Sequence, residues 1–367
     1  MRITFVVPFL WFTGGLRVVF EYSRQLAKQG HSVTIAYPLV PYRFGRSLPG
    51  YLAHIVEAIG WNVKYRNRPK WTDSEIHPTL VLPIKQGWES CLPDGDVVLA
   101  TAWPTAHTVS GLSGQKGKKA YFIQDYEVWG DAPADRVDRT FSLPLKPIVI
   151  SSWLQGVIHQ VSGRPMDEIA LVSNGIDLQQ FHNPSKVFHQ PRRILMVYRE
   201  ARRKGIADGI RAFELAREQH PDIQLVMMGL KQGSDVPQHA EFHENPAQDE
   251  LRQIYSSCDI LVFSSWQEGC GLPPMEAMAC QCAVVATNVG SIPDYALAGR
   301  TALISEPRDP EALAQNIVRL LDDEAELRRI SQAGYEHIRQ FTWERATDKL
   351  EQVLASLLES QDWNRCC

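Results

Sequence analysis

The 367-residue chain lacks an uninterrupted apolar run of the ~18–20 residues that a membrane-spanning helix needs. Its N-terminal run FVVPFLW is apolar, but it is short, contains a proline, and leads into Thr-Gly-Gly rather than into a small-residue cleavage site. We therefore expect this run to form a first strand and not a signal peptide.

Cysteine is scarce and follows no pattern. The seven cysteines are odd in number, and Cys280-x-Cys282 has no second ligand pair nearby, so neither a disulfide framework nor a zinc site is expected. A reducing cytoplasm is the expected setting. Asp94-Gly95-Asp96 imitates an Asp-x-Asp metal motif, but Asp-Gly is a strong turn signal, so we favour a turn and expect no metal.

The net charge is also small, at −4. We therefore expect no nucleic-acid partner. Residues 1–177 hold 18 Lys and Arg against 15 Asp and Glu, whereas residues 178–367 hold 20 against 27. The mildly basic first half favours an anionic acceptor, or peripheral contact with the inner membrane surface.

Internal repeats and low-complexity tracts are absent, and predicted strands and helices alternate through both halves. This pattern is typical of mostly parallel sheets covered by helices, and the length suits two domains. We expect two doubly wound α/β domains at 1–177 and 192–344, joined by a linker at 178–191. Residues 38–95, rich in proline and aromatic residues, are expected to be irregular.

The most informative segment is EGCGLPPMEAMA (268–279), which lies between two predicted strands. Pro273 or Pro274 suits a first helical position, where the missing N–H costs nothing. The free N–H groups of such a helix N-terminus attract phosphate. Glu276, expected in the first helical turn, would reach sugar hydroxyls beside that phosphate, although a glutamate there also simply complements the helix dipole.

This segment resembles the E-x7-E signature of retaining glycosyltransferases of family 4, and VVATNVGSIPDY (284–295) matches that family too. The resemblance implies the GT-B fold, in which two Rossmann-like domains face each other across a cleft. It also implies that a C-terminal helix at about 345–362 crosses back to the first domain.

The resemblance assigns roles to the motif. Glu268 would lie beside the donor sugar and Glu276 would bind the ribose. The backbone N–H groups of Gly271 and Leu272 would bind the phosphate.

Arg199 and Lys204 follow a predicted strand at the family's R-x4-K spacing, which implies a pair that holds the donor diphosphate. The alternative is a solvated basic turn, because two further arginines enlarge the same cluster. Phe242 and Asn245, in FHEN, fall where the family seats the nucleobase.

In the first half, Gly14 and Gly15 stand between the first strand and helix, where the family has a loop that closes over donor and acceptor. The run QDYE (124–127) replaces the family's His-Asp pair and resembles some bacterial rhamnosyltransferase-like members. Asp125 is the candidate group for the acceptor.

The predicted function is retaining transfer of a hexose or deoxyhexose from a nucleoside diphosphate sugar, as in polysaccharide biosynthesis. The acceptor would be a hydroxyl of a glycan, a lipid-linked saccharide or a small molecule, and no metal or other cofactor is expected. Two alternatives stay open: a non-catalytic nucleotide-sugar binding protein, and a sugar-nucleotide epimerase on the same fold. A dinucleotide-dependent dehydrogenase is disfavoured because no strand precedes G-x-G-x-x-G.

Overall fold

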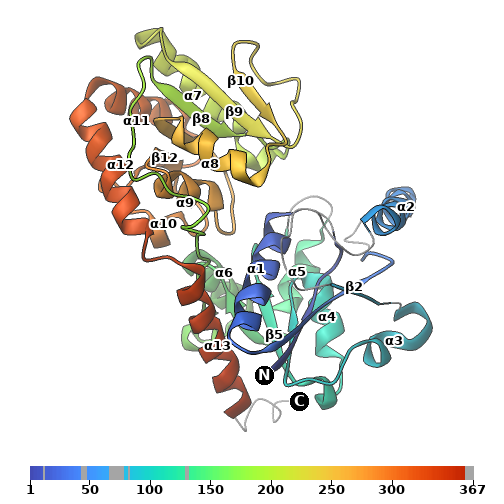
Figure 1. Cartoon of the computed structure of the whole chain (residues 1–367). Coiled ribbons are helices and arrows are strands. Elements are labelled where there is room, and N and C mark those ends of the chain that lie inside the picture. Colours follow the sequence, from blue (N-terminus) through green and yellow to red (C-terminus); the bar gives the residue numbers. More distant parts are fainter. Residues whose placement is uncertain (11–12, 43–47, 66–77, 82, 129–131, 360–367) are drawn as a thin grey trace. The chain divides into compact units, whose positions relative to one another are not determined.

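The computed structural model describes residues 1–10, 13–42, 48–65, 78–81, 83–128 and 132–359. The chain forms two compact units, each built on one parallel sheet with helices around it (Figure 1). The first unit combines Met1–Asn174 with Trp343–Cys367, and the second is Gly175–Thr342. The expected α/β class with two Rossmann-like domains is confirmed.

The first sheet has the order β3-β2-β1-β4-β5-β6-β7, and every paired strand is parallel. Its central strands are buried along most or all of their length, which explains why they are continuous apolar runs rather than alternating ones. The strands are β1 (Arg2–Val6), β2 (Ser32–Pro38), β3 (Thr79–Val81), β4 (Val97–Ala100), β5 (Lys118–Ile123), β6 (Lys146–Val149) and β7 (Ala170–Leu171).

The C-terminal helix α13 belongs to the first unit, where it packs on α1. Trp343 meets the buried Tyr22 edge to face, with ring centroids 5.3 Å apart, and His31 Nε2 lies 2.8 Å from the Glu351 carboxylate. The helices of this unit are α1 (Gly14–Lys28), α2 (Leu48–Tyr65), α3 (Pro83–Cys91), α4 (Trp103–Ser110), α5 (Ala134–Thr140), α6 (Ser152–Ser162) and α13 (Trp343–Glu359). Residues 360–362 of the expected helix lie outside the described residues.

The second sheet has the order β10-β9-β8-β11-β12-β13 and is also parallel. Two hydrophobic clusters cover its faces, because neighbouring residues of a strand point to opposite sides: Ile194 belongs to one cluster and Leu195 to the other. The strands are β8 (Arg193–Val197), β9 (Gln224–Gly229), β10 (Glu241–Glu244), β11 (Ile260–Phe263), β12 (Ala283–Thr287) and β13 (Leu303–Ser305). The helices are α7 (Ile206–Gln219), α8 (Gln248–Ser256), α9 (Leu272–Ala279), α10 (Ile292–Tyr295), α11 (Pro310–Asp322) and α12 (Glu324–Ile338).

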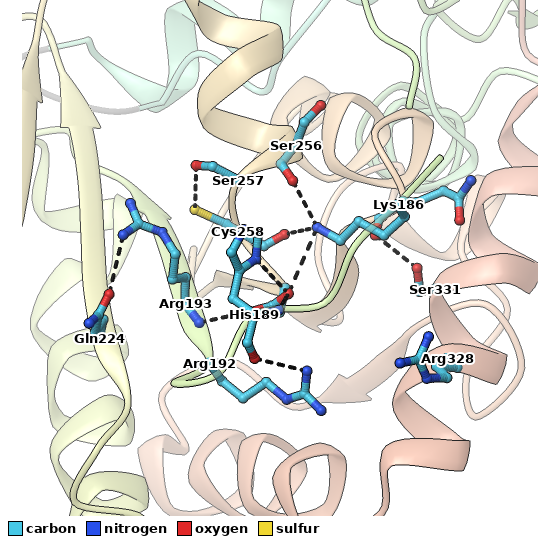
Figure 2. A network of polar contacts seen from close by, with 12 residues as sticks. Lys186, His189, Arg192, Arg193, Gln224, Ser256, Ser257, Cys258, Arg328 and Ser331 are labelled. Carbon is cyan, nitrogen blue, oxygen red and sulfur yellow. Dashed lines mark hydrogen bonds and ion pairs between the residues drawn. The ribbon is translucent and has the colours of Figure 1, made fainter. Parts of the chain in front are cut away.

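The segment 178–191, expected to be a linker, is held firmly by the second unit (Figure 2). The buried ammonium of Lys186 donates to the backbone carbonyl of Cys258 and lies 4.0 Å from the Asp259 carboxylate. Asp259 also accepts a hydrogen bond from the backbone N–H of His189 at 3.0 Å. The composition of this segment predicted a linker between the halves, and two of its residues, Lys186 and His189, make hydrogen bonds to buried groups of the second unit.

The stretch 38–95, expected to be irregular, contains helices α2 and α3 and strand β3. The prolines suggested irregular structure, but Pro83 does not interrupt α3. It takes the first position of this helix, where a proline is tolerated. Among the described residues, no helix is long and apolar enough to span a bilayer.

Candidate functional site

The second sheet reverses its strand order between β8 and β11, which are neighbours in space but not in sequence. In open parallel α/β sheets, ligands bind outside the carboxyl ends of the strands at such a point. The segments that leave these ends are 198–205 after β8, 264–271 after β11 and 288–291 after β12. Four of the eight site residues predicted for the second half lie in the first two of these segments: Arg199, Lys204, Glu268 and Gly271.

Lys204 and Glu268 meet at this point. The lysine Nζ lies 2.5 Å from Glu268 Oε1, and the hydroxyl of Ser265 donates to the same oxygen at 3.0 Å. The lysine and glutamate side chains are 19% and 13% exposed. This ion pair is therefore largely shielded from bulk water, and it places one cation and one carboxylate at the carboxyl ends of these strands.

The basic turn before α7, residues 202–204, packs closely against the end of β11. The Trp266 backbone N–H donates to the Arg203 carbonyl at 2.8 Å. Gly205 has a positive φ of 58°, and a Cβ there would lie 2.0 Å from the Ser264 carbonyl oxygen. Only glycine allows the turn to approach so closely, and this approach presents the lysine of the ion pair to its glutamate.

Helix α9 begins at a turn whose carbonyls are held by hydroxyl groups. The Ser291 hydroxyl donates to the Cys270 carbonyl at 2.5 Å, and the Tyr295 hydroxyl donates to the Gly271 carbonyl at 2.6 Å. In a planar trans peptide the carbonyl and the next N–H point in opposite directions. The N–H groups of Gly271 and Leu272 therefore point away from these hydroxyls, and the next two residues are prolines without an N–H.

Glu276 lies in the second turn of α9, so its expected position in the first turn is wrong. The helix starts at Leu272, before Pro273, and this places Glu276 fifth. The residue is only 5% exposed, and its Oε2 accepts a hydrogen bond of 2.7 Å from the buried hydroxyl of Tyr255 on α8. Because helical side chains lean toward the N-terminus, the carboxylate still projects toward the start of the helix.

Tyr255 and Ser265, which help to hold this site in shape, were not predicted from the sequence. The run 284–295 matched the family pattern, but none of its residues was predicted to have a role. Gly290, in that run, has φ 57°, and a Cβ there would lie 2.3 Å from the Glu268 carbonyl oxygen. The glycine was the signal that could have indicated this close approach.

The other residues predicted for the donor do not join the ion pair. Arg199 is exposed and forms no ion pair within the described part of the chain. Phe242, on the edge strand β10, packs edge to face on Tyr198 at 6.0 Å. Asn245 has a positive φ of 47°, and its N–H donates to the Gly229 carbonyl at 2.6 Å.

In the first unit, Gly14 and Gly15 are the first residues of α1 and not a free loop, because the Thr13 hydroxyl caps the helix. A Cβ on Gly15 would lie 3.4 Å from Gln124 Oε1, so this helix start meets the end of β5. Asp125 follows directly, and its carboxylate accepts from the next backbone N–H at 2.9 Å.

Glu127, two residues further on, was also missed. The backbone N–H of Trp103, the first residue of α4, donates to its Oε2 at 2.7 Å. Burial raises the pKa of the Glu127 carboxyl to about 8, the hydrogen bond lowers it, and the charge of Asp125 raises it. At neutral pH this carboxyl is mostly protonated.

Asp94 and Asp96 lie in the connection between α3 and β4, and each has a cationic partner. Lys116 Nζ donates to Asp94 at 2.8 Å, and the Arg2 guanidinium and backbone N–H donate to Asp96. These hydrogen bonds hold the pKa of both carboxyls below its usual range. Within the described ranges, no group of three or more His, Cys, Asp or Glu side chains is arranged to hold a metal.

Residues 178–337 match the model of the family described as "Glycosyl transferases group 1", and this match covers almost the whole second unit. The second unit is a group 1 glycosyltransferase domain. Lys204, Glu268 and Glu276 all lie inside this group 1 domain, whereas Gly14 and Asp125 lie outside it.

The chain is also similar to named proteins. It is 29% identical over 153 residues to the D-inositol 3-phosphate glycosyltransferase of Corynebacterium diphtheriae, covering 38% of this chain and 36% of that protein. The protein of the same name from Corynebacterium glutamicum is 23% identical over 338 residues, covering 83% of this chain and 77% of that one. The chain thus spans about a third of the first relative's length, and most of the second's.

Among solved structures, Anabaena Alr3699/HepE in complex with UDP and glucose superposes with a TM-score of 0.74. The match covers 97% of this chain and 100% of that chain at 15% identity. At this identity the likeness shows the fold, which for the group 1 domain and the first unit together is that of GT-B glycosyltransferases.

Proposed function

We propose that the chain is a retaining glycosyltransferase that moves a hexose or deoxyhexose from a nucleoside diphosphate sugar to an acceptor hydroxyl. The observation that supports this most is the Lys204–Glu268 ion pair, which joins the segments after β8 and β11, the second of which leads directly into the N-terminus of α9. Cation, carboxylate and N–H donors leave neighbouring strands at the switch point of one sheet. This set matches the charges of a sugar bonded to a diphosphate.

Each group would have a separate task. Lys204 would neutralise the diphosphate oxygens as the bond to the anomeric carbon breaks, and the N–H groups of Gly271 and Leu272 would bind a phosphate oxygen. Glu276, oriented by Tyr255, would accept hydrogen bonds from the ribose hydroxyls. Because basic side chains and N–H groups supply the positive charge, the proposal requires no metal.

Retention of the anomeric configuration is proposed because of the hydrogen bonds that Glu268 accepts. Its Oε1 already receives hydrogen bonds from the lysine and from Ser265, which makes it a poor nucleophile. A carboxylate so held suits hydrogen bonding to the sugar and stabilising positive charge at the anomeric centre. The acceptor would then attack on the face that the diphosphate leaves, with a phosphate oxygen taking its proton.

The donor is proposed to be a uridine diphosphate hexose. This choice follows HepE, whose structure was solved in complex with UDP and glucose, and rests on fold likeness. The QDYE run favours a thymidine diphosphate deoxyhexose as the second candidate. The acceptor is proposed to be a hydroxyl of a glycan, a lipid-linked saccharide or a small molecule.

Calorimetric titration with UDP, GDP, dTDP and their sugars tests the site. One nucleotide family should bind to the wild-type protein, and Glu276→Gln should weaken it about tenfold by removing a charged acceptor. Glu311→Gln, at an exposed position on α11, is the matched control and should bind like wild type. Equal affinity in wild type, Glu276→Gln and Glu311→Gln would show that Glu276 does not bind the donor.

Incubation of the bound donor with and without a panel of acceptors separates the rival functions. A transferase forms a glycoside only with acceptor, and NMR of its anomeric proton should show the donor's configuration. An epimerase would convert the donor alone, and a binding protein would leave it intact. Activity should persist in a chelator, since the proposed site uses no metal.

A further inference from the structure

Two arginines from different segments of the second unit lie over the indole ring of Trp266. The guanidinium carbon of Arg202 is 5.7 Å from the ring centroid, and that of Arg308 is 4.8 Å from it. Arg202 belongs to the basic turn before α7, Trp266 to the segment after β11, and Arg308 to the segment after β13. All three lie beyond the carboxyl ends of parallel strands, which is where ligands bind in open α/β sheets. We call these three residues the arginine–indole cluster.

The indole ring of the cluster is fixed in place. Its Nε1–H donates to Asp208 Oδ2 at 2.6 Å, and the backbone N–H of Trp266 donates to the Arg203 carbonyl at 2.8 Å. Arg308 has a positive φ of 67°, a conformation that non-glycine residues rarely adopt and that occurs preferentially at ligand-binding positions. A rigid ring thus supports both arginine side chains.

Neither guanidinium of the cluster has an anionic partner within the part of the chain that the structure describes. Both arginines are exposed, and in that part neither forms an ion pair or a hydrogen bond through its side chain. The neighbouring carboxylates have other partners, because Asp208 accepts from the indole and Asp309 accepts from the Ala312 N–H at the start of α11. A guanidinium that lies over a ring can still offer its five N–H donors to a ligand.

The shape and charge of the cluster indicate which anion it would bind. Two like charges over one ring repel each other, and an anion between them would remove this repulsion. A carboxylate has two oxygens, which the fork of a single guanidinium already matches. A phosphate monoester has three terminal oxygens and a charge of roughly −1.5 to −2 at neutral pH, which matches two guanidinium groups. The cluster therefore favours a phosphate group.

We propose that Arg202 and Arg308 bind a phosphate group of the acceptor, which would then be a phosphate ester of a sugar or polyol. The basic turn that carries Arg202 also carries Lys204, and the segment that carries Trp266 also carries Glu268. In the proposed function the donor diphosphate is bound by Lys204 and the N-terminus of α9, so a further phosphate-binding group suits the second substrate. This inference rests on the proposed glycosyl transfer and narrows its class of acceptor.

Titration of ¹⁵N-labelled protein with inorganic phosphate, followed by NMR at the indole N–H of Trp266, tests the cluster without nucleotide or acceptor. The variant Trp266→Phe assigns this signal among those of the ten tryptophans. In wild type the signal should shift saturably with phosphate, and it should not shift with chloride at the same ionic strength. The double variant Arg202→Gln, Arg308→Gln should bind phosphate at least about tenfold more weakly, because it loses two charged donors.

The matched control is the double variant Arg211→Gln, Arg300→Gln, which removes two exposed arginines elsewhere on the second unit and should bind phosphate like wild type. Lys204→Met should also keep the shift, because it changes the donor site and not the cluster. The replaced arginines are all exposed, so the fold should persist, and circular dichroism checks this. The proposal is overturned if the wild-type signal ignores phosphate, if Lys204→Met alone abolishes the shift, or if the two double variants behave alike.

Transfer to a panel of sugars and polyols, each offered with and without a phosphate monoester, tests the class of acceptor. Phosphate esters should have a KM at least about tenfold below that of the neutral compounds, and loss of both cluster arginines should remove this difference with little change in kcat. Calorimetry with glucose 6-phosphate and geranyl diphosphate separates a soluble from a lipid-linked source of the phosphate. Transfer to neutral acceptors alone would refute this inference and keep the glycosyl transfer, whereas phosphate binding without any transfer would refute both.

Discussion

The Glu127→Gln variant should gain stability relative to the wild-type protein as the pH rises. The wild-type carboxyl has a pKa of about 8 in the folded protein, against 4.5 for an ordinary glutamate. The folded state therefore holds this proton more tightly than the unfolded state. Its contribution to stability is complete below pH 4.5 and is lost as the pH rises toward 8.

The size of the effect follows from the shift. At about 1.36 kcal/mol per pKa unit, a shift from 4.5 to about 8 corresponds to at most ~5 kcal/mol. Glu127 keeps some contact with solvent, and screening reduces the expected change to roughly 2–4 kcal/mol. Glutamine keeps the size of the protonated side chain and its acceptor for the Trp103 N–H, but has no proton to lose.

Denaturant unfolding of both proteins at about pH 5, 7 and 9, followed by circular dichroism, measures this change. The free energy of unfolding of wild type should fall relative to Glu127→Gln across the series. Glu89→Gln is the control: hydrogen bonds from Ser113 lower the pKa of Glu89, so its effect should not change between neutral and alkaline pH. Parallel pH profiles for wild type and Glu127→Gln would refute the reasoning.

Three further variants test the second unit. Tyr255→Phe removes the hydroxyl that orients Glu276 and should weaken nucleotide binding about 3–10-fold by calorimetry; unchanged affinity would show that this hydrogen bond does not matter for the donor. Gly290→Ala puts a Cβ 2.3 Å from the Glu268 carbonyl and should cost at least about 2 kcal/mol of unfolding free energy, whereas a neutral result would mean that the turn relaxes freely. Lys204→Met should lower the transfer rate about 100-fold or more in a turnover assay, and a wild-type rate would exclude Lys204 from catalysis.

Much of the fold could be predicted from local patterns. The apolar runs ILVF and AVVAT predicted β11 and β12, because a strand buried on both faces is apolar throughout. The stretch 38–95 defeated the same approach. Its prolines and aromatic residues suggested irregular structure, but α2 forms there with only part of its surface against its own unit.

The candidate site divides in the same way. The family resemblance of the sequence pointed to Lys204, Glu268 and Glu276. Glu276 was expected in the first turn of α9 but is the fifth residue of the helix, because the exact helix start depends on the cap at Gly271. The sequence had no means of finding Tyr255, whose partner is 21 residues away.

By itself the sequence determined the alternation of strands and helices, the two-domain division and the types of residue at each strand end. These features are visible in residues that are close in the sequence, because each helix or strand repeats with one fixed period along the chain. Only the tertiary structure decided which strand ends meet. The lysine after β8 reaches the glutamate after β11, 64 residues further along the chain, because the sheet places these two strands side by side. The exposure of large apolar side chains on α2 likewise became visible only once burial was known. Spatial contact and exposure are properties of the whole folded chain, so no local pattern carries them.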